Sequence, residues 1–182
     1  AKIGVAGIGG LGSNILSHLV RSGISQFVAA DFDTVSHSNL NRPFLFADQI
    51  GKLKTEAAAE NLRRINPDLH LELHAVRLTS DNIRTIFANC DIVVEAFDSA
   101  DAKTLLIEEL RESGKPIVAA SGLAGFGRSN LIQVRQIGKL LYLAGDLVSG
   151  ISPDLAPASP RVGIAAAMQA NTVIALLLGR EV

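Results

Sequence analysis

The chain has 182 residues, of which 48% are hydrophobic, 4% aromatic and 19% charged, and its formal net charge at pH 7 is −1. This length predicts a single domain over residues 1–182, and the near-neutral charge disfavours nucleic acid or a membrane surface as a partner. The lone cysteine, Cys90, excludes an intrachain disulfide and a zinc site built from paired cysteines, and it fits a reducing cytoplasm.

Apolar runs alternate with stretches of helical periodicity along most of the chain. This order predicts an α/β, Rossmann-like fold with a mostly parallel, doubly wound sheet. We expect parallel strands at residues 2–6, 26–30, 69–76, 91–96 and 116–120. We expect the intervening helices at residues 11–22, 53–65, 81–88 and 102–113, the third of them capped by Ser80.

The rhythm changes after residue 120. A glycine-rich loop, Ser121–Arg128, precedes two apolar runs, Leu131–Ile137 and Leu140–Ala144, which flank Gly138-Lys139 and predict a hairpin. The C-terminal part therefore adds antiparallel strands to the sheet. Residues 145–159 read as irregular, and Pro160 begins a last apolar helix that we interpret as buried against a neighbour, with no membrane span expected.

A glycine motif follows the first expected strand. Gly7, Gly9 and Gly12 have the G-x-G-x-x-G spacing, with Gly10 and Leu11 between them. Such glycines permit a tight turn, a close approach of backbone to phosphate, and close packing of helix on strand, and the helix start then faces an anion. The motif predicts a nucleotide site, although a purely structural glycine turn is an alternative reading.

Charged residues gather where a nucleotide would lie. Asp31 closes the second strand, where a carboxylate accepts hydrogen bonds from ribose hydroxyls, so a dehydrogenase and an ATP-dependent enzyme fit equally well. The long loop after it and the next helix add Arg42 and Lys54, cations that suit a triphosphate better than a nicotinamide cofactor. Asp98 ends the fourth strand at the same edge of the sheet and is placed to hold Mg²⁺, unless it only caps the following helix.

This constellation resembles the ThiF/MoeB/HesA family of ubiquitin-activating-enzyme-like adenylyltransferases. The matching pieces span nearly the whole chain, and they are residues 7–13, 31–33, 39–42, 51–54, 66–67, 98 and 156–169. The stretches 97–103 and 119–128 look most like the short ThiF-like branch of thiamine biosynthesis.

The resemblance implies a role for each matching residue. Asp31 would bind the ribose, Asn39 and Arg42 the phosphates, and Lys54 the α-phosphate. Asp98 would coordinate Mg²⁺, and Asp33 would support the site or the metal. Of these residues Arg42, Lys54 and Asp98 are the candidate catalytic ones.

The reaction implied is adenylation of the C-terminal glycine carboxylate of a ubiquitin-like sulfur carrier ending in Gly-Gly, with ATP consumed and pyrophosphate released. A homodimer is expected, because the last helix and the hairpin offer more apolar surface than one small sheet requires.

Departures from the family pattern leave alternatives open. The chain lacks the zinc cysteines, an arginine-bearing N-terminal arm and a late-loop cysteine; Lys103 stands where relatives often place arginine, and Cys90 is expected to be a buried structural thiol. The alternatives are a non-catalytic, nucleotide-bound carrier-docking subunit, an NAD-dependent oxidoreductase, and ATP-dependent activation of a carboxylate on tRNA. The alternating His70, Glu72 and His74 are interpreted as a solvated edge-strand face and not as a metal site.

Overall fold

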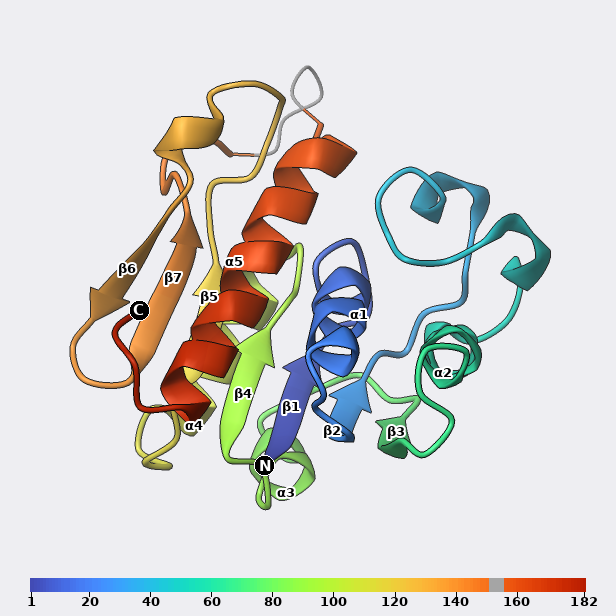
Figure 1. Ribbon diagram of the computed structural model, residues 1–182, viewed down its shortest axis with the longest axis horizontal. Coiled ribbons are helices and arrows are strands. Elements are labelled where there is room, and N and C mark those ends of the chain that lie inside the picture. Colours follow the sequence, from blue (N-terminus) through green and yellow to red (C-terminus); the bar gives the residue numbers. More distant parts are fainter. Residues whose placement is uncertain (151–155) are drawn as a thin grey trace.

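The sheet of this protein has seven strands in the order β3-β2-β1-β4-β5-β7-β6 (Figure 1). The computed structural model describes residues 1–150 and 156–182, so part of the expected irregular segment 145–159 lies outside the described residues. The strands are β1 Lys2–Ala6, β2 Gln26–Ala30, β3 His70–His74, β4 Ile92–Glu95, β5 Ile117–Ala120, β6 Gln133–Ile137 and β7 Leu141–Gly145. Neighbouring strands are parallel except β6 and β7, which form the hairpin. The fold class predicted from the sequence is confirmed.

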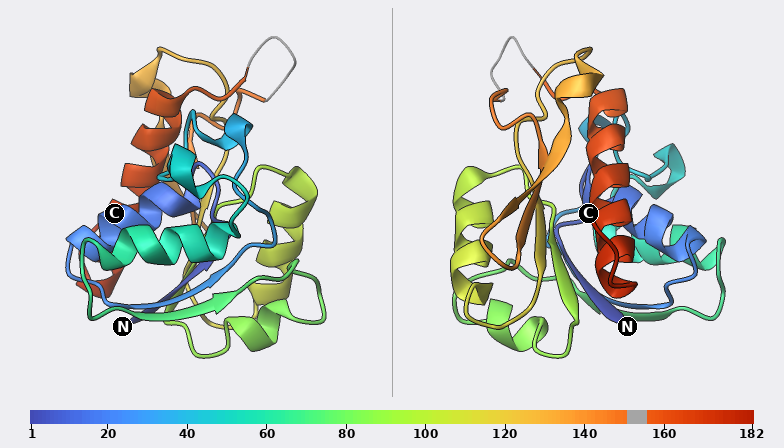
Figure 2. Two further views of the ribbon diagram at one scale, coloured as in Figure 1. Left: turned by 90° about the vertical axis from the view of Figure 1, so that its right-hand side faces the viewer. Right: turned by 60° about the vertical axis from the view of Figure 1, so that its left-hand side comes forward.

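Helices cover both faces of this sheet. They are α1 Gly12–Arg21, α2 Lys54–Arg63, α3 Ile83–Ile86, α4 Ala100–Leu110 and α5 Ser159–Leu177. One face carries α1, α2 and α5, and the other carries α3 and α4 (Figure 2). Because the inner strands are buried on both faces, β1, β4 and β5 are nearly continuous apolar runs.

The edge strand β3 differs from the inner strands, because each of its residues is exposed or half-buried. Glu72 forms an ion pair with Lys2 at 3.2 Å and a hydrogen bond with His74 at 3.1 Å. Among the residues that the structure describes, no group of three His, Cys, Asp or Glu side chains is arranged to hold a metal ion. The polar face of β3 is thus a solvated, charge-paired edge.

Two helix starts differ from the expectation. Helix α3 begins at Ile83, and the prediction that Ser80 caps it is wrong. Asn82 precedes the helix, and its Oδ1 accepts a hydrogen bond from the Thr79 amide at 2.9 Å, so residues 79–82 form a turn of their own. Helix α4 begins earlier than expected, at Ala100, because the Ser99 side chain caps it by accepting from the Ala102 amide at 3.5 Å.

Helix α5 is the long apolar helix expected at the C-terminus. By length and composition it meets the criteria for a membrane-crossing helix. Its most apolar 18-residue stretch has a mean hydropathy of 1.2, and 44% of this stretch is buried inside the fold. Its buried side, which includes Ala165, Ala166 and Val173, packs on α1 and the sheet. Gln169 donates hydrogen bonds to the carbonyl oxygens of Glu95 and Val118, and these bonds hold the helix on β4 and β5.

Candidate functional site

The glycine turn between β1 and α1 has a shape that side chains would prevent. Gly7 has a φ of 94°, and a Cβ on Gly12 would lie 1.9 Å from the Gly7 carbonyl oxygen. Gly9 instead has open space on the side where a Cβ would stand, and it faces the cavity. Gly12 therefore serves the packing of helix on strand, while Gly9 leaves the backbone accessible to a ligand.

Asp31 at the end of β2 is tied to the glycine turn. Its carboxylate accepts hydrogen bonds from the Ile8 amide at 2.6 Å and from the Asp33 amide at 2.9 Å, and the residue is 9% exposed. Burial raises the pKa of Asp31, although both amides and the nearby Lys54 charge act to lower it. The carboxylate is therefore fixed in place at the edge of the cavity.

Lys54, the first residue of α2, places its ammonium group between two carboxylates. Its Nζ lies 2.7 Å from Asp33 and 4.0 Å from Asp31, and the residue is 6% exposed. Its backbone amide also donates to the Asp33 carbonyl oxygen at 2.9 Å. These contacts hold a buried cation at the cavity wall, where it can bind an anionic group.

The long loop after β2 brings Asn39 and Arg42 to the cavity. Asn39 Oδ1 accepts a hydrogen bond from the Ser36 amide at 3.1 Å and so shapes the loop. The backbone of Arg42 is held from α1, because Asn14 donates to its carbonyl oxygen at 2.9 Å. A second bond also joins this loop to α1, because the Phe44 amide donates to Ser13 Oγ at 2.8 Å.

Asp98 follows β4 and is exposed in the cavity. Because Ser99 caps α4, the alternative that Asp98 is only the helix cap is wrong. Below it, Glu95 is fully buried and forms an ion pair with Lys103, and its carboxylate accepts from the Phe97 amide at 2.7 Å. Burial raises the pKa of Glu95 against the charge of Lys103. The buried Glu95 carboxylate thus fixes the turn that carries Asp98.

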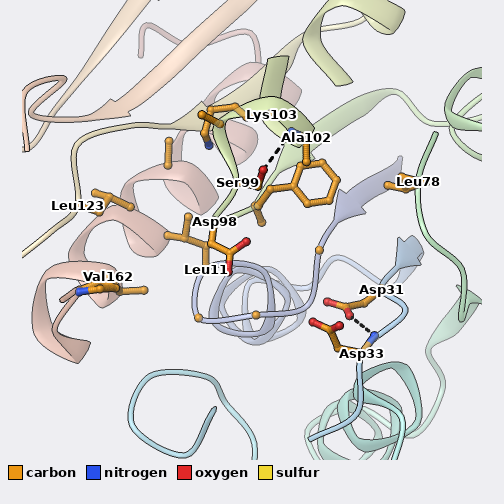
Figure 3. A pocket seen from close by; sticks show the side chains of 18 of the residues that line it. Leu11, Asp31, Asp33, Leu78, Asp98, Ser99, Ala102, Lys103, Leu123 and Val162 are labelled. Atoms are coloured by element: carbon orange, nitrogen blue, oxygen red, sulfur yellow. Dashed lines mark hydrogen bonds between the residues drawn. The ribbon is translucent and has the colours of Figure 1, made fainter. Parts of the chain in front are cut away.

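One cavity of about 590 Å³ collects these residues at the carboxyl ends of the strands. It is lined by ten of the eleven predicted site residues, namely Gly7, Gly9, Gly10, Leu11, Asp31, Asp33, Asn39, Arg42, Lys54 and Asp98. Gly12, the eleventh, packs beneath the turn. Figure 3 shows Asp31 and Asp33 together, with Asp98 across the glycine turn from them.

A family model described as the ThiF family matches residues 1–182. The chain belongs to the ThiF family. The resemblance seen in the sequence motifs is confirmed.

Two fungal proteins named adenylyltransferase and sulfurtransferase UBA4 are similar to this ThiF-family chain. The Candida glabrata protein is 36% identical over 139 residues, which is 76% of this chain and 32% of that protein. The Lodderomyces elongisporus protein is 32% identical over 185 residues, or 98% of this chain and 41% of that protein. The chain therefore spans about a third to two fifths of the length of these relatives.

Solved structures with a similar fold support the observed architecture. Escherichia coli tRNA N6-threonylcarbamoyladenosine dehydratase, TcdA, in complex with AMP has a TM-score of 0.84 and 26% identity, covering 99% of this chain and 88% of that one. Escherichia coli MccB in complex with AMPCPP and MccA has a TM-score of 0.75 and 24% identity, and the match covers 97% of this chain and 56% of that one. At this identity the likeness shows a shared fold only.

Sequence reasoning missed several residues of this ThiF-family site. Ser13 ends the matching stretch 7–13 but was given no role, and Asn14 carries no signal beyond lying at a helix start, yet both hold the loop that bears Arg42. Glu95 was visible only as a charge in an apolar strand, a pattern that indicates a buried, paired group. Cys90 is buried, as expected, and burial raises its pKa to about 11, so the thiol is protonated at neutral pH.

Proposed function

We propose that this protein is an ATP-dependent adenylyltransferase that activates the C-terminal glycine carboxylate of a small ubiquitin-like sulfur carrier. A carboxylate oxygen attacks the α-phosphorus of ATP and forms a bond to it. The bond from the α-phosphorus to the oxygen that bridges the α- and β-phosphates breaks, and pyrophosphate leaves with its electron pair. The product is an acyl-adenylate on the carrier. A carrier ending in Gly-Gly, and the thiamine sulfur carrier first of all, is the proposed substrate.

One observation carries this proposal: a buried cation and a fixed carboxylate flank the same glycine turn. Asp31 lies where a ribose would be bound, and the Lys54 ammonium lies beside it at the start of α2. Two anions, a carboxylate and a triphosphate, repel each other, so their reaction requires positive charge at the α-phosphate. Lys54 and Arg42, which both line the cavity, supply that charge.

Asp98 suits a magnesium ion by its chemistry and its exposure. Its carboxylate is a hard oxygen ligand that faces the cavity, and Mg²⁺ in nucleotide sites is usually bound by one or two carboxylates together with phosphate oxygens. Bound there, the ion would neutralise charge on the leaving pyrophosphate. Asp98 would hold it, while Lys54 and Arg42 orient the phosphates.

Pyrophosphate exchange tests the proposal. The protein is incubated with Mg²⁺-ATP, labelled pyrophosphate and a panel of purified ubiquitin-like carriers that end in Gly-Gly. We expect carrier-dependent formation of labelled ATP, and its loss in Asp98→Ala. Absence of exchange with every carrier, in a protein that binds Mg²⁺-ATP, would refute the adenylation reaction and favour the non-catalytic docking subunit, which keeps carrier affinity in Asp98→Ala.

Two other functions remain distinguishable by ligand. An NAD-dependent oxidoreductase uses the glycine turn and Asp31 but gives no role to Arg42, Lys54 or Asp98, and NAD⁺ would then raise the melting temperature where Mg²⁺-ATP does not. Activation of a carboxylate on tRNA is favoured by the likeness to TcdA. It predicts ATP consumption with tRNA and none with the carriers, and the net charge of −1 speaks against it.

The proposal extends to the setting of the reaction. We place it in the cytoplasm, where the lone thiol of Cys90 stays reduced. We also propose a homodimer and a site that needs neither zinc nor a covalent cysteine intermediate.

A further inference from the structure

Arg161 is a buried cation that the proposed chemistry does not use. It lies in the first turn of α5 and is 3% exposed. Both burial and the positive end of the helix dipole disfavour a cation at this place. The position therefore requires strong compensating contacts.

Those contacts join three segments of the chain. Nη1 of Arg161 donates to the Gly127 carbonyl oxygen at 2.8 Å, and Nη2 donates to the Gly122 carbonyl oxygen at 3.4 Å and to Ser149 Oγ at 3.3 Å. The guanidinium also forms an ion pair with Asp146. The guanidinium spreads its donors over a rigid planar fork that reaches acceptors lying apart from one another, whereas a lysine ammonium has all three of its donors on one nitrogen.

Asp146 organises the segment that follows β7. Its Oδ1 accepts hydrogen bonds from the amides of Val148 and Ser149, both at 2.9 Å. Burial acts to raise the pKa of Asp146, but the hydrogen bonds from Ser149 and Val148 and the charge of Arg161 outweigh it and lower the pKa to about 2. The carboxylate is charged at neutral pH and pairs with the guanidinium.

The loops held by Arg161 approach each other closely. A Cβ on Gly122 would lie 2.0 Å from Asp146 Oδ1, and a Cβ on Gly145 would lie 1.5 Å from the Ser121 carbonyl oxygen. The Asp146 amide donates to the Gly122 carbonyl oxygen at 3.3 Å. Only glycine fits such contacts, so the two loops form one compact unit.

This unit forms part of the cavity wall. The glycine-loop wall, as we call residues 121–123 together with 149–150, lines the cavity and contains no charged side chain. Figure 3 shows Leu123 of this wall on the far side of the cavity from Asp31 and Asp33. Asp31 and Asp33 thus lie on a different side of the cavity from the wall.

We propose that Arg161 is a positioning residue for the acyl substrate, because it holds the glycine-loop wall in the shape against which the extended C-terminal chain of that substrate lies. Asp31, the carboxylate that suits a ribose, lies on the other side, so the wall is the part of the cavity that remains for the second substrate. Backbone groups and small side chains there fit an extended peptide with small residues. This inference rests on the proposed function and adds which residue sets the substrate path.

The test compares Arg161→Lys, which keeps the charge but not the fork of donors, with Asp146→Asn, which keeps the shape but not the charge. Arg64→Lys, an exposed site at the end of α2, is the matched control. The carrier that drives exchange with the unmodified protein is the probe. We expect KM for the carrier to rise roughly tenfold in both wall variants, with the dissociation constant of Mg²⁺-ATP and kcat at saturating carrier within about twofold.

Hydrogen exchange gives an independent readout that needs no carrier. The amides of Gly125 and Asp146, which bond across the loops, should exchange faster in Arg161→Lys than in the unmodified protein, while Mg²⁺-ATP affinity stays unchanged. Unchanged KM, or a loss of ATP affinity in step with the rise in KM, would overturn the positioning role. If no carrier is activated, the proposed function fails. An unchanged exchange rate or a loss of nucleotide affinity in Arg161→Lys would then overturn the role of Arg161 separately.

Discussion

Two lysines on either side of Leu53 have different surroundings and therefore different expected roles. Lys52 Nζ lies on the surface, 2.7 Å from Glu60, whereas Lys54 Nζ is buried between Asp31 and Asp33. An exposed pair adds little to stability or binding, and a buried cation beside a ligand contributes more. The pair gives a matched comparison.

We predict that Lys54→Met lowers Mg²⁺-ATP affinity by about tenfold or more, since a charge-assisted contact to phosphate is lost. Lys52→Met should leave that affinity unchanged within about twofold. Isothermal titration calorimetry of both variants measures the difference. Equal affinities in the two variants would remove Lys54 from the nucleotide site.

The depressed pKa of Asp146 predicts how stability depends on pH. Burial raises this pKa, but hydrogen bonds from Ser149 and Val148 and the Arg161 charge bring it from 3.8 to about 2 in the folded chain. The carboxylate therefore stabilises the fold above the unfolded pKa, and this contribution disappears as the pH falls through the folded pKa. The melting temperature of Asp146→Asn should lie below that of the unmodified protein near pH 6, and the gap should narrow between about pH 4 and pH 2. A gap that is constant with pH would contradict the pairing.

At the scale of elements, two glycines in helices have opposite expected effects. A Cβ on Gly12 meets the Gly7 carbonyl oxygen, whereas Gly163 in α5 has open space around it. We predict that Gly12→Ala destabilises the fold by about 2 to 3 kcal/mol, and that Gly163→Ala stabilises it by about 0.5 to 1 kcal/mol. Urea denaturation measures both. If Gly12→Ala were neutral, the turn would be looser than the contact implies.

The sequence predicted most elements and most of the lining of the site, because these follow from local patterns. Alternating apolar runs locate the parallel strands, and the spacing of Gly7, Gly9 and Gly12 specifies a turn whatever surrounds it. The ion pairs of Glu95 with Lys103 and of Asp146 with Arg161 could not be predicted from the sequence, because they depend on how the elements pack. Ser80 failed as a cap because Asn82 forms a competing turn.

At the scale of the whole molecule, apolar surface remains exposed on the C-terminal half. Leu178 after α5 is 66% exposed and Ile137 at the end of β6 is 47% exposed. That residues 1–182 form one domain, and that two copies associate through α5 and the hairpin, stay predictions.

Light scattering at micromolar concentration should give the mass of a dimer, and dilution should shift the mass toward that of one chain. A monomer at micromolar concentration would contradict the dimer. It would also require the site to be complete within one chain.

The mass of the carrier after reaction tests the proposed chemistry most directly. A Gly-Gly-ended carrier that supports pyrophosphate exchange is incubated with the protein and Mg²⁺-ATP, and its intact mass is measured before the adenylate hydrolyses. We predict an added mass of one adenylate at the C-terminal carboxylate, absent without Mg²⁺ and absent with Asp98→Ala. An unchanged carrier mass, with ATP bound in the cavity, would contradict carboxylate adenylation.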